Sequence, residues 1–263
     1  MSGSVSPVSG GAGRAARVTQ RHGTIIVVGG GCYGAYYVRQ LLRAARSDAL
    51  TWERLVVVDR DPACQVARSG APLDAPGSSP AAEVVVAEWR AYFERAIPEG
   101  RANDAIVPSP LMPHLMVEWL IDRVRERFPD REVGLKALDA ELPVPWQMAN
   151  GDAPHYASFA TWTCPVTCIE PATCPHTRTA RDWSMPVAMR AYVESRVAAG
   201  RPLGGPLLFH CEHRAFGVGM FDVAPVREAG AIVLAAAEQG AAEFLVGTVS
   251  HCHGALARLV IGA

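Results

Sequence analysis

The strongest constraint on the fold is a glycine cluster that separates an apolar run from a helical pattern. Residues 24–29 read TIIVVG, which is typical of a buried strand, and residues 33–46 carry apolar side chains at helical spacing. Between them, Gly29, Gly31 and Gly34 fit the spacing G-x-G-x-x-G. A strand that turns into a helix at such glycines presents helix N–H groups and a positive dipole to a phosphate. The segment therefore predicts a dinucleotide-binding α/β unit.

Each position of this loop has an expected role. Gly29 permits the tight turn, Gly31 lets a pyrophosphate approach the backbone, and Gly34 lets the helix pack on the strand. Cys32 and Tyr33 stand between these glycines, and we expect both to contact the dinucleotide, with Cys32 packed under it.

An acidic residue ends the next apolar run, as a dinucleotide site requires. Residues 54–59 read RLVVVD, and we expect Asp59 to accept hydrogen bonds from the adenine ribose hydroxyls. The carboxylate would repel a 2′-phosphate, so NAD is favoured over NADP. The adjacent Arg60 softens that preference.

The N-terminal part resembles a known family. The stretch IIVVGGGCYGAYYVRQLL, followed by LVVVDRDP, is similar to the Rossmann NAD(P)-binding superfamily, in particular to the N-terminal NAD-binding domain of potassium-uptake regulators of the RCK or TrkA-N type. The resemblance covers residues 23–64, under a fifth of the chain. Those regulators commonly place Gly-Asp after the third strand, whereas Ala87-Glu88-Trp89 stands here. The resemblance therefore implies a nucleotide-binding fold and not the regulators' function.

The rest of the chain predicts the fold class. Apolar runs alternate with helical patterns, which favours an α/β, doubly wound, mostly parallel Rossmann-like sheet with a Cys-rich irregular insertion. We expect six parallel strands with the insertion before the fifth; a separate C-terminal domain is the alternative. The expected divisions are a disordered tail (1–22), a Rossmann half (23–138), the insertion (139–183) and a second α/β half that completes the sheet (184–263).

Cysteine and histidine are crowded into the C-terminal half. Five of the seven Cys and six of the eight His fall between His155 and His253. Cys164, Cys168 and Cys174 lie in the irregular stretch, where a metal bound by thiolates would order the loop. Their spacing matches neither the C-x₂-C zinc pattern nor the common ferredoxin pattern, so an iron–sulfur cluster and zinc both stay open.

Two further clusters follow the last two expected strands of the sheet. Residues 210–213 read HCEH and residues 251–253 read HCH. Because the carboxyl ends of parallel strands lie at one edge, we expect both clusters beside the glycine loop. If the strand persists, His251 and His253 face one way and Cys252 the other. The candidate metal ligands are Cys164, Cys168, Cys174, Cys211, Cys252, His210, His213, His251 and His253. The ordinary alternative is that these are buried thiols and hydrogen-bonded core histidines.

Three residues are candidates for catalysis. Cys211 and Cys252 each stand beside a histidine, an arrangement that can activate a thiolate nucleophile. His114 follows the fourth expected strand, where it would act as an acid–base group near a nicotinamide or simply cap the next helix.

Composition excludes several function classes. The net charge is −1, so the chain has no basic field for nucleic acid, and Lys136 is the only lysine. No apolar run reaches the ~18 residues of a membrane helix. An odd Cys count without a signal peptide favours the cytoplasm.

Together these features predict an NAD(P)-binding protein with an iron–sulfur or zinc site and an oxidoreductase-type redox role. Its partners would be the dinucleotide and a redox protein or small-molecule substrate, and a homo-oligomer stays open. A non-enzymatic NAD- and metal-binding sensor, or an accessory protein for a metalloenzyme, fits the same residues. A structural zinc protein with a vestigial nucleotide site is the third interpretation.

Overall fold

Short β-branched runs in the N-terminal half build a parallel sheet. The computed structural model describes all residues except 1–18, 70–80, 150, 152–153 and 166–167. Four strands pair in parallel in the order β3-β2-β1-β4, and two strands from the C-terminal half extend the sheet in antiparallel fashion as β10 and β9. The strands are β1 (Gln20–Val28), β2 (Leu50–Asp59), β3 (Ala82–Val86), β4 (Ala105–Val107), β9 (Glu212–Ala215) and β10 (Val218–Asp222).

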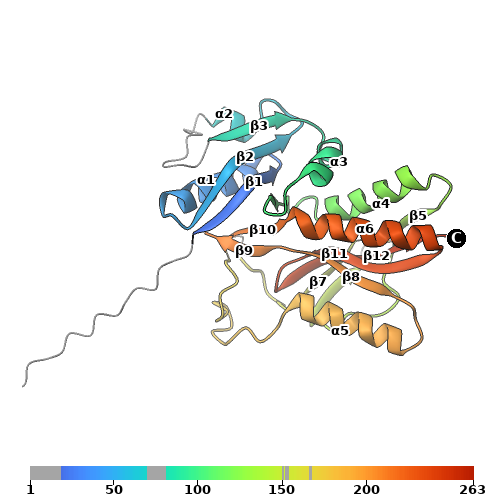
Figure 1. The fold of residues 1–263 in the computed structure, drawn as a ribbon. Coiled ribbons are helices and arrows are strands. Elements are labelled where there is room, and N and C mark those ends of the chain that lie inside the picture. Colours follow the sequence, from blue (N-terminus) through green and yellow to red (C-terminus); the bar gives the residue numbers. More distant parts are fainter. Residues whose placement is uncertain (1–18, 70–80, 150, 152–153, 166–167) are drawn as a thin grey trace, which may run out of the picture.

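Helices cover both faces of this first sheet because its strands are apolar on both sides. Alternate residues of β1 enter different cores: Ile25 packs in the cluster that contains α1, and Ile26 packs in the cluster that contains α3, α4 and α6. The helices are α1 (Cys32–Arg46) and the short α2 (Gln65–Arg68) on one side, and α3 (Trp89–Glu99), α4 (Leu115–Arg127) and α6 (Val223–Gln239) on the other (Figure 1).

The C-terminal half forms a second sheet in the order β6-β7-β12-β11-β8, with β5 also paired to β12. Only β8 and β11 pair in parallel, and the other pairs are antiparallel. Helix α5 (Met185–Ala198) packs Met185 and Met189 against Leu245 and Leu256 of this sheet. The strands are β5 (Val133–Lys136), β6 (Trp146–Ala149), β7 (His155–Ser158), β8 (Gly204–His210), β11 (Ala242–Val249) and β12 (His253–Ile261).

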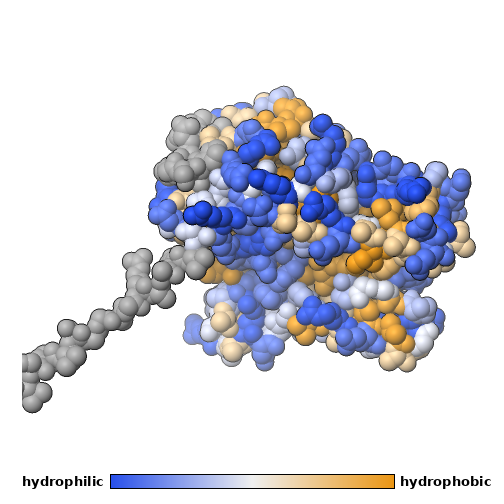
Figure 2. All heavy atoms as spheres, viewed as in Figure 1, coloured by the Kyte–Doolittle hydropathy of each residue, from blue (hydrophilic) through white to orange (hydrophobic). Residues whose placement is uncertain are grey.

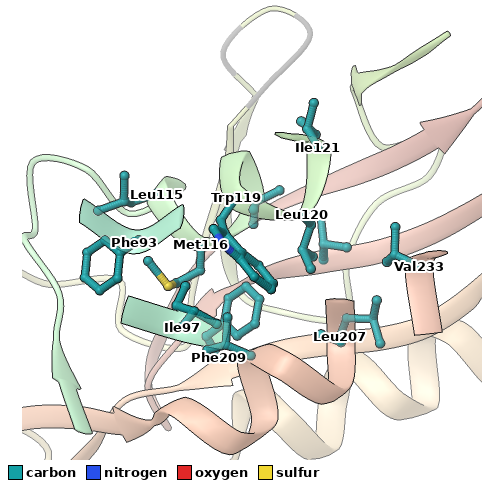
Figure 3. Packing of buried hydrophobic residues seen from close by; sticks show 14 of the residues in the cluster. Phe93, Ile97, Leu115, Met116, Trp119, Leu120, Ile121, Leu207, Phe209 and Val233 are labelled. Atoms are coloured by element: carbon teal, nitrogen blue, oxygen red, sulfur yellow. The ribbon is translucent and has the colours of Figure 1, made fainter. Parts of the chain in front are cut away.

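One hydrophobic cluster joins the two sheets. It contains Phe93 and Ile97 of α3, Trp119 of α4 and Phe209 of β8 (Figure 3). Helices α4 and α6 approach closely at Gly230, where an added Cβ would lie 2.8 Å from the Trp119 ring. The packing of α4 on α6 therefore fixes how the two sheets meet. It also fixes the positions of the strand ends of one sheet relative to those of the other.

The structure differs from the single sheet that the sequence predicts. The chain is a mixed α/β protein with two sheets, and the last strands complete the second sheet instead of the first. The reason is that β11 and β12 form an antiparallel hairpin, whose pairing adds strands without crossover helices. The expected insertion, residues 139–183, contains β6 and β7.

The expected N-terminal tail also ends earlier than predicted. Strand β1 begins at Gln20, so residues 20–22 belong to the sheet, and residues 1–18 lie outside the described part of the chain. No helix of the described residues is long and apolar enough to cross a bilayer. On the face in Figure 2, hydrophobic residues form separate patches among hydrophilic ones.

Candidate functional site

The glycine loop between β1 and α1 forms a tight turn at the N-terminus of the helix. Gly29 has a positive φ of 87°. A Cβ on Gly34 would lie 1.8 Å from the Gly29 carbonyl oxygen, so only glycine fits there. A Cβ on Gly31 would meet no atom within 4 Å, so this position opens outward. Helix α1 has no side-chain cap and no acidic residue in its first turn, which leaves its N-terminal N–H groups available to an anion.

Asp59 at the end of β2 holds the loop in place. Its Oδ2 accepts a hydrogen bond from the Gly30 N–H at 2.6 Å, and its Oδ1 accepts one from the Asp61 N–H at 2.9 Å. Each carboxylate oxygen has a second lone pair, so ribose hydroxyls remain compatible with these bonds. Cys32 is exposed at the first residue of α1, Tyr33 is half-buried, and Arg60 is exposed beside Asp59.

Two residues beside Asp59 were not predicted from the sequence. The Trp89 indole donates a hydrogen bond to the Val58 carbonyl at 2.9 Å, and its ring lies next to Gly29. Val86 pairs with Asp59 across β2 and β3 and is 56% exposed. Together they give the edge beside Asp59 an apolar wall. The only sequence feature that pointed to this wall was Ala87-Glu88-Trp89, which stands where the potassium-uptake regulators carry Gly-Asp.

The two strand-end clusters of the C-terminal half lie side by side, as their parallel pairing predicts. His210, the last residue of β8, is in register with Val249 of β11. The Cys211 N–H then donates a hydrogen bond to the Val249 carbonyl at 2.7 Å. Cys211 is also the residue at which the chain passes from the second sheet into β9 of the first.

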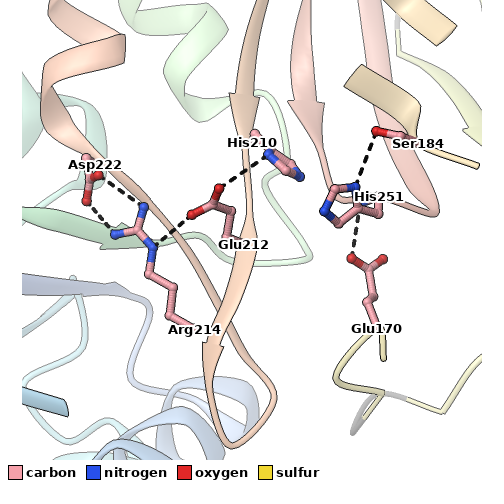
Figure 4. Close-up of polar contacts among 7 residues, drawn as sticks. All are labelled: Glu170, Ser184, His210, Glu212, Arg214, Asp222 and His251. Atoms are coloured by element: carbon pink, nitrogen blue, oxygen red, sulfur yellow. Dashed lines mark hydrogen bonds and ion pairs between the residues drawn. The ribbon is translucent and has the colours of Figure 1, made fainter. Parts of the chain in front are cut away.

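The histidines of these clusters have different neighbours. The rings of His210 and His251 contact edge to face at 4.7 Å, and Ser184 at the start of α5 lies 3.3 Å from His251 Nδ1 (Figure 4). Cys211 and His253 line a cavity that His210 does not. A common face for His251 and His253 was expected only if the strand persisted, and that condition is not met, because β11 ends at Val249 and β12 begins at His253.

The cavity lies where the two sheets meet and has a volume of about 290 Å³. Tyr37 of α1 and the loop after β4 line it from the N-terminal half of the chain. The other residues come from the C-terminal half. The lining consists of Tyr37, Pro108, Ser109, Pro110, Pro113, Tyr156, Cys211, His213, Gly217, Gly219, Thr248, Val249, Ser250, His253, Gly254 and Ala255.

A hydroxyl network fixes the ring of His253. The Ser158 hydroxyl donates its single proton to the Ala160 carbonyl at 2.8 Å. It therefore accepts from His253 Nδ1, which lies 2.9 Å away. This assigns the ring proton of neutral His253 to Nδ1 and leaves Nε2 as a hydrogen-bond acceptor.

Glu170 joins the Cys-rich loop to the turn after β11. Its carboxylate accepts hydrogen bonds from Ser250 Oγ at 2.6 Å and from the N–H groups of His251 and Cys252 at 3.1 Å each. Burial raises the pKa of Glu170, but these bonds and the nearby His213 outweigh it and leave the pKa below its ordinary value. Glu170 is thus a half-buried carboxylate that holds the turn, a role that no sequence motif indicated.

Removing the charge of Glu170 should destabilise the protein. We expect Glu170→Gln to lower the free energy of unfolding by about 1–3 kcal/mol at pH 7. The amide NH₂ of glutamine cannot accept hydrogen bonds, so at least one of the groups that donate to the Glu170 carboxylate loses its acceptor. Glu238→Gln, on the exposed side of α6, is the matched control. Urea unfolding at several pH values is the measurement.

The pH dependence gives this prediction a sign. The folded pKa of Glu170 lies below the ordinary 4.5. Its stabilisation is therefore present above pH 4.5 and is lost as the pH falls through the folded pKa. The gap between parent and Glu170→Gln should close in acid, and a gap that does not change with pH would contradict the role assigned to the charge.

The Cys-rich loop surrounds its sulfur atoms with donors. The Glu170 N–H donates to Cys168 Sγ at 3.4 Å. Hydrogen bonds from Thr177 lower the pKa of Cys174 below its ordinary 9.0, whereas burial and the nearby Cys168 and Cys174 raise that of Cys164. Trp183 Nε1 donates to Cys252 Sγ at 3.2 Å, which ties the loop to the turn after β11.

The nine predicted ligands do not form one ready-made site. Among the described residues, no group of three or more His, Cys, Asp or Glu side chains converges closely enough to hold a metal ion. Two imidazole nitrogens are nevertheless free to bind a ligand. His213 Nδ1 and His210 Nε2 are buried without a hydrogen-bond partner in the part of the chain described. A donor set of soft thiols and free imidazole nitrogens fits zinc or an iron–sulfur cluster.

The predicted catalytic residues find little support in the geometry. Burial raises the pKa of Cys211 and of Cys252 to about 12, so both are neutral thiols at pH 7, which disfavours an activated thiolate. His114 stands at the start of α4 with both ring nitrogens buried and unpaired within the described residues, and burial lowers its pKa. Its neighbour Pro113 lines the cavity, but His114 does not.

Taken together, the fold and the site define a mixed α/β protein with a Cys/His-rich segment at the junction of two sheets. The chain belongs to the family described as AF_1314_C, "Uncharacterized protein, C-terminal domain", which matches residues 116–262, more than half of the 263 residues. The matched region contains the whole second sheet, the Cys-rich loop and both strand-end clusters, and the glycine loop lies outside it. No curated protein and no solved structure matches the chain.

Proposed function

We propose that this protein is a Rossmann-type, NAD(P)-binding redox protein whose reaction takes place in the cavity between the two sheets. One observation carries the proposal: the cavity is lined both by Tyr37 of α1, the helix that follows the glycine loop, and by Cys211 and His253 of the Cys/His-rich half. A dinucleotide bound at the loop and chemistry at the strand ends would therefore share one space.

The loop supports binding of the dinucleotide. The parallel order β3-β2-β1-β4 with a glycine turn after β1 is the arrangement that seats a pyrophosphate on a helix N-terminus. Gly31 leaves room for the phosphates, and Asp59 favours NAD over NADP. When bound, the nicotinamide would supply or accept a hydride. The loop after β4, where the cavity begins, is where a dinucleotide's second half lies in such folds.

The Cys-rich loop supports a metal as the second component. Cys164, Cys168 and Cys174 are the candidate ligands, and Cys211 or Cys252 is the candidate fourth. A cation would stabilise the thiolates and offset the burial that raises the pKa values of Cys211 and Cys252. The metal would supply structural order if it is zinc and electron storage if it is an iron–sulfur cluster.

A sensor or accessory protein is the second candidate. Cys211 and Cys252 are neutral thiols, and His114 is not among the described residues that line the cavity, so none of the three predicted catalytic residues is activated there, and this observation favours binding without turnover. The sensor would bind the dinucleotide at the glycine loop and the metal at the Cys-rich loop, as the redox protein would.

An anaerobic NADH titration tests the proposal and separates the two candidates. NADH fluorescence reports binding, and NADH oxidation with ferricyanide or small carbonyl compounds as acceptors reports turnover. Binding with turnover supports a redox enzyme, and saturable binding without turnover by any acceptor supports the sensor. Folded protein that binds neither NADH nor NADPH at 1 mM, on the order of the weakest physiological affinities, would overturn the proposal.

A further inference from the structure

We infer that the cavity between the sheets holds a small uncharged molecule bearing a hydroxyl or carbonyl oxygen. The inference rests on the proposed function, because it names the substrate class of the same site. It depends on which side chains line the cavity, on which charges are already paired at its border, and on where hydrogen-bonding atoms are free.

The described lining contains no Asp, Glu, Lys or Arg. Among the described residues, charged groups close to it include Glu170, Arg214 and Arg181, and each is engaged. Arg181 donates a hydrogen bond to the Glu170 backbone carbonyl. Glu170 accepts three hydrogen bonds at the turn after β11. Arg214 is paired with Glu212 and with Asp222, whose Oδ2 lies 3.1 Å from Nη2 (Figure 4). A carboxylate or phosphate taken into this cavity would lose its water without meeting a charged group in the described lining, which is unfavourable.

The described lining includes a free donor and a free acceptor. The Tyr37 hydroxyl has no hydrogen-bond partner within the described residues, and it faces the lining from α1. The Ser158 network fixes the proton of His253 on Nδ1 and leaves Nε2 as an acceptor. An alcohol can donate to His253 and accept from Tyr37, and a carbonyl oxygen can accept from Tyr37.

Shape agrees with a compact ligand. The volume of about 290 Å³ lies at the lower end of small-molecule sites. Pro108, Pro110, Pro113 and Tyr156 supply flat apolar walls. A ring with one polar oxygen therefore matches the cavity better than an extended or multiply charged compound.

Benzyl alcohol and benzoate are matched probes, since they share the ring and differ in charge. Ligand-observed NMR titration of the full chain, without NADH, should give saturable binding of benzyl alcohol and at least tenfold weaker binding of benzoate. Equal or tighter binding of benzoate would overturn the inference, as would no saturable binding of benzyl alcohol.

Variants locate the binding. Gly219→Leu should weaken benzyl alcohol binding at least tenfold, because a Cβ there makes ordinary contacts of 3.5 Å and the rest of the side chain enters the cavity. Gly134→Leu in β5 is the control, since a Cβ there meets no atom within 4 Å. Tyr37→Phe, which keeps the ring, should weaken binding about fivefold, the loss of one hydrogen bond. Unchanged binding by folded Gly219→Leu or by Tyr37→Phe would contradict the location.

NADH binding is measured on the same samples, so the two proposals fail separately. Benzyl alcohol binding without NADH binding would overturn the dinucleotide proposal and leave the cavity assignment standing. NADH binding without benzyl alcohol binding would do the reverse.

Discussion

Gly31→Ala should fold like the parent protein and lose at least tenfold in affinity for NADH. The backbone at Gly31 has a φ of −73°, which alanine adopts without strain, and the new methyl group meets no protein atom within 4 Å. In the proposed complex, however, that space belongs to the pyrophosphate. Displacing the phosphates from the α1 N-terminus removes charge-assisted hydrogen bonds worth about 1.5–3 kcal/mol each.

The measurement is an NADH fluorescence titration beside a thermal melt. Gly134→Ala controls for adding a methyl group in open space elsewhere. Gly34→Ala is not informative, because its Cβ would collide with the Gly29 carbonyl and disturb the loop itself. If Gly31→Ala binds NADH as the parent does, the glycine loop is not the dinucleotide site.

The second large effect is expected in the Cys-rich loop. Protein purified without oxygen should carry stoichiometric zinc, or iron with sulfide and visible absorbance. Cys168→Ser should retain less than a tenth of that metal, because serine replaces a soft thiolate with a hard, weakly acidic hydroxyl. Cys32→Ser is the matched control. Cys32 is exposed at the start of α1, a helix that packs on the first sheet, and it lies outside the Cys-rich loop.

Elemental analysis per folded chain decides this prediction. Equal metal in the Cys168→Ser and Cys32→Ser variants would assign the metal to other residues. Parent protein that is folded, colourless and metal-free would show that Glu170 and the hydrogen bonds around it order the loop unaided.

Local patterns explain which parts of the fold could be predicted from the sequence. The run at 24–29, the glycines and Asp59 each determine their own backbone geometry, so the β1–α1–β2 unit follows from them. The neighbouring positions of Cys211 and the turn at 250–252 also followed, because β8 and β11 are parallel and end in register.

What the sequence did not reveal depends on contacts between distant residues. The apolar pattern of β12 fits a strand in either sheet, and only its hairpin with β11 decides the second. The turn at 250–252 is held by Glu170, about 80 residues away, so the strand does not persist there and its alternation does not apply. Tyr37 reaches the cavity because the packed helices bring the two sheets together, and no spacing in α1 indicates that.

Hydrogen exchange with and without saturating NADH shows whether one dinucleotide contacts both halves of the chain. We expect slower exchange at the glycine loop and at the start of α1, together with slower exchange in the cavity segments 109–113, 217–219 and 250–254. Slower exchange confined to the loop alone, to the cavity segments alone or to segments outside both, or no change at saturation, would contradict the proposal.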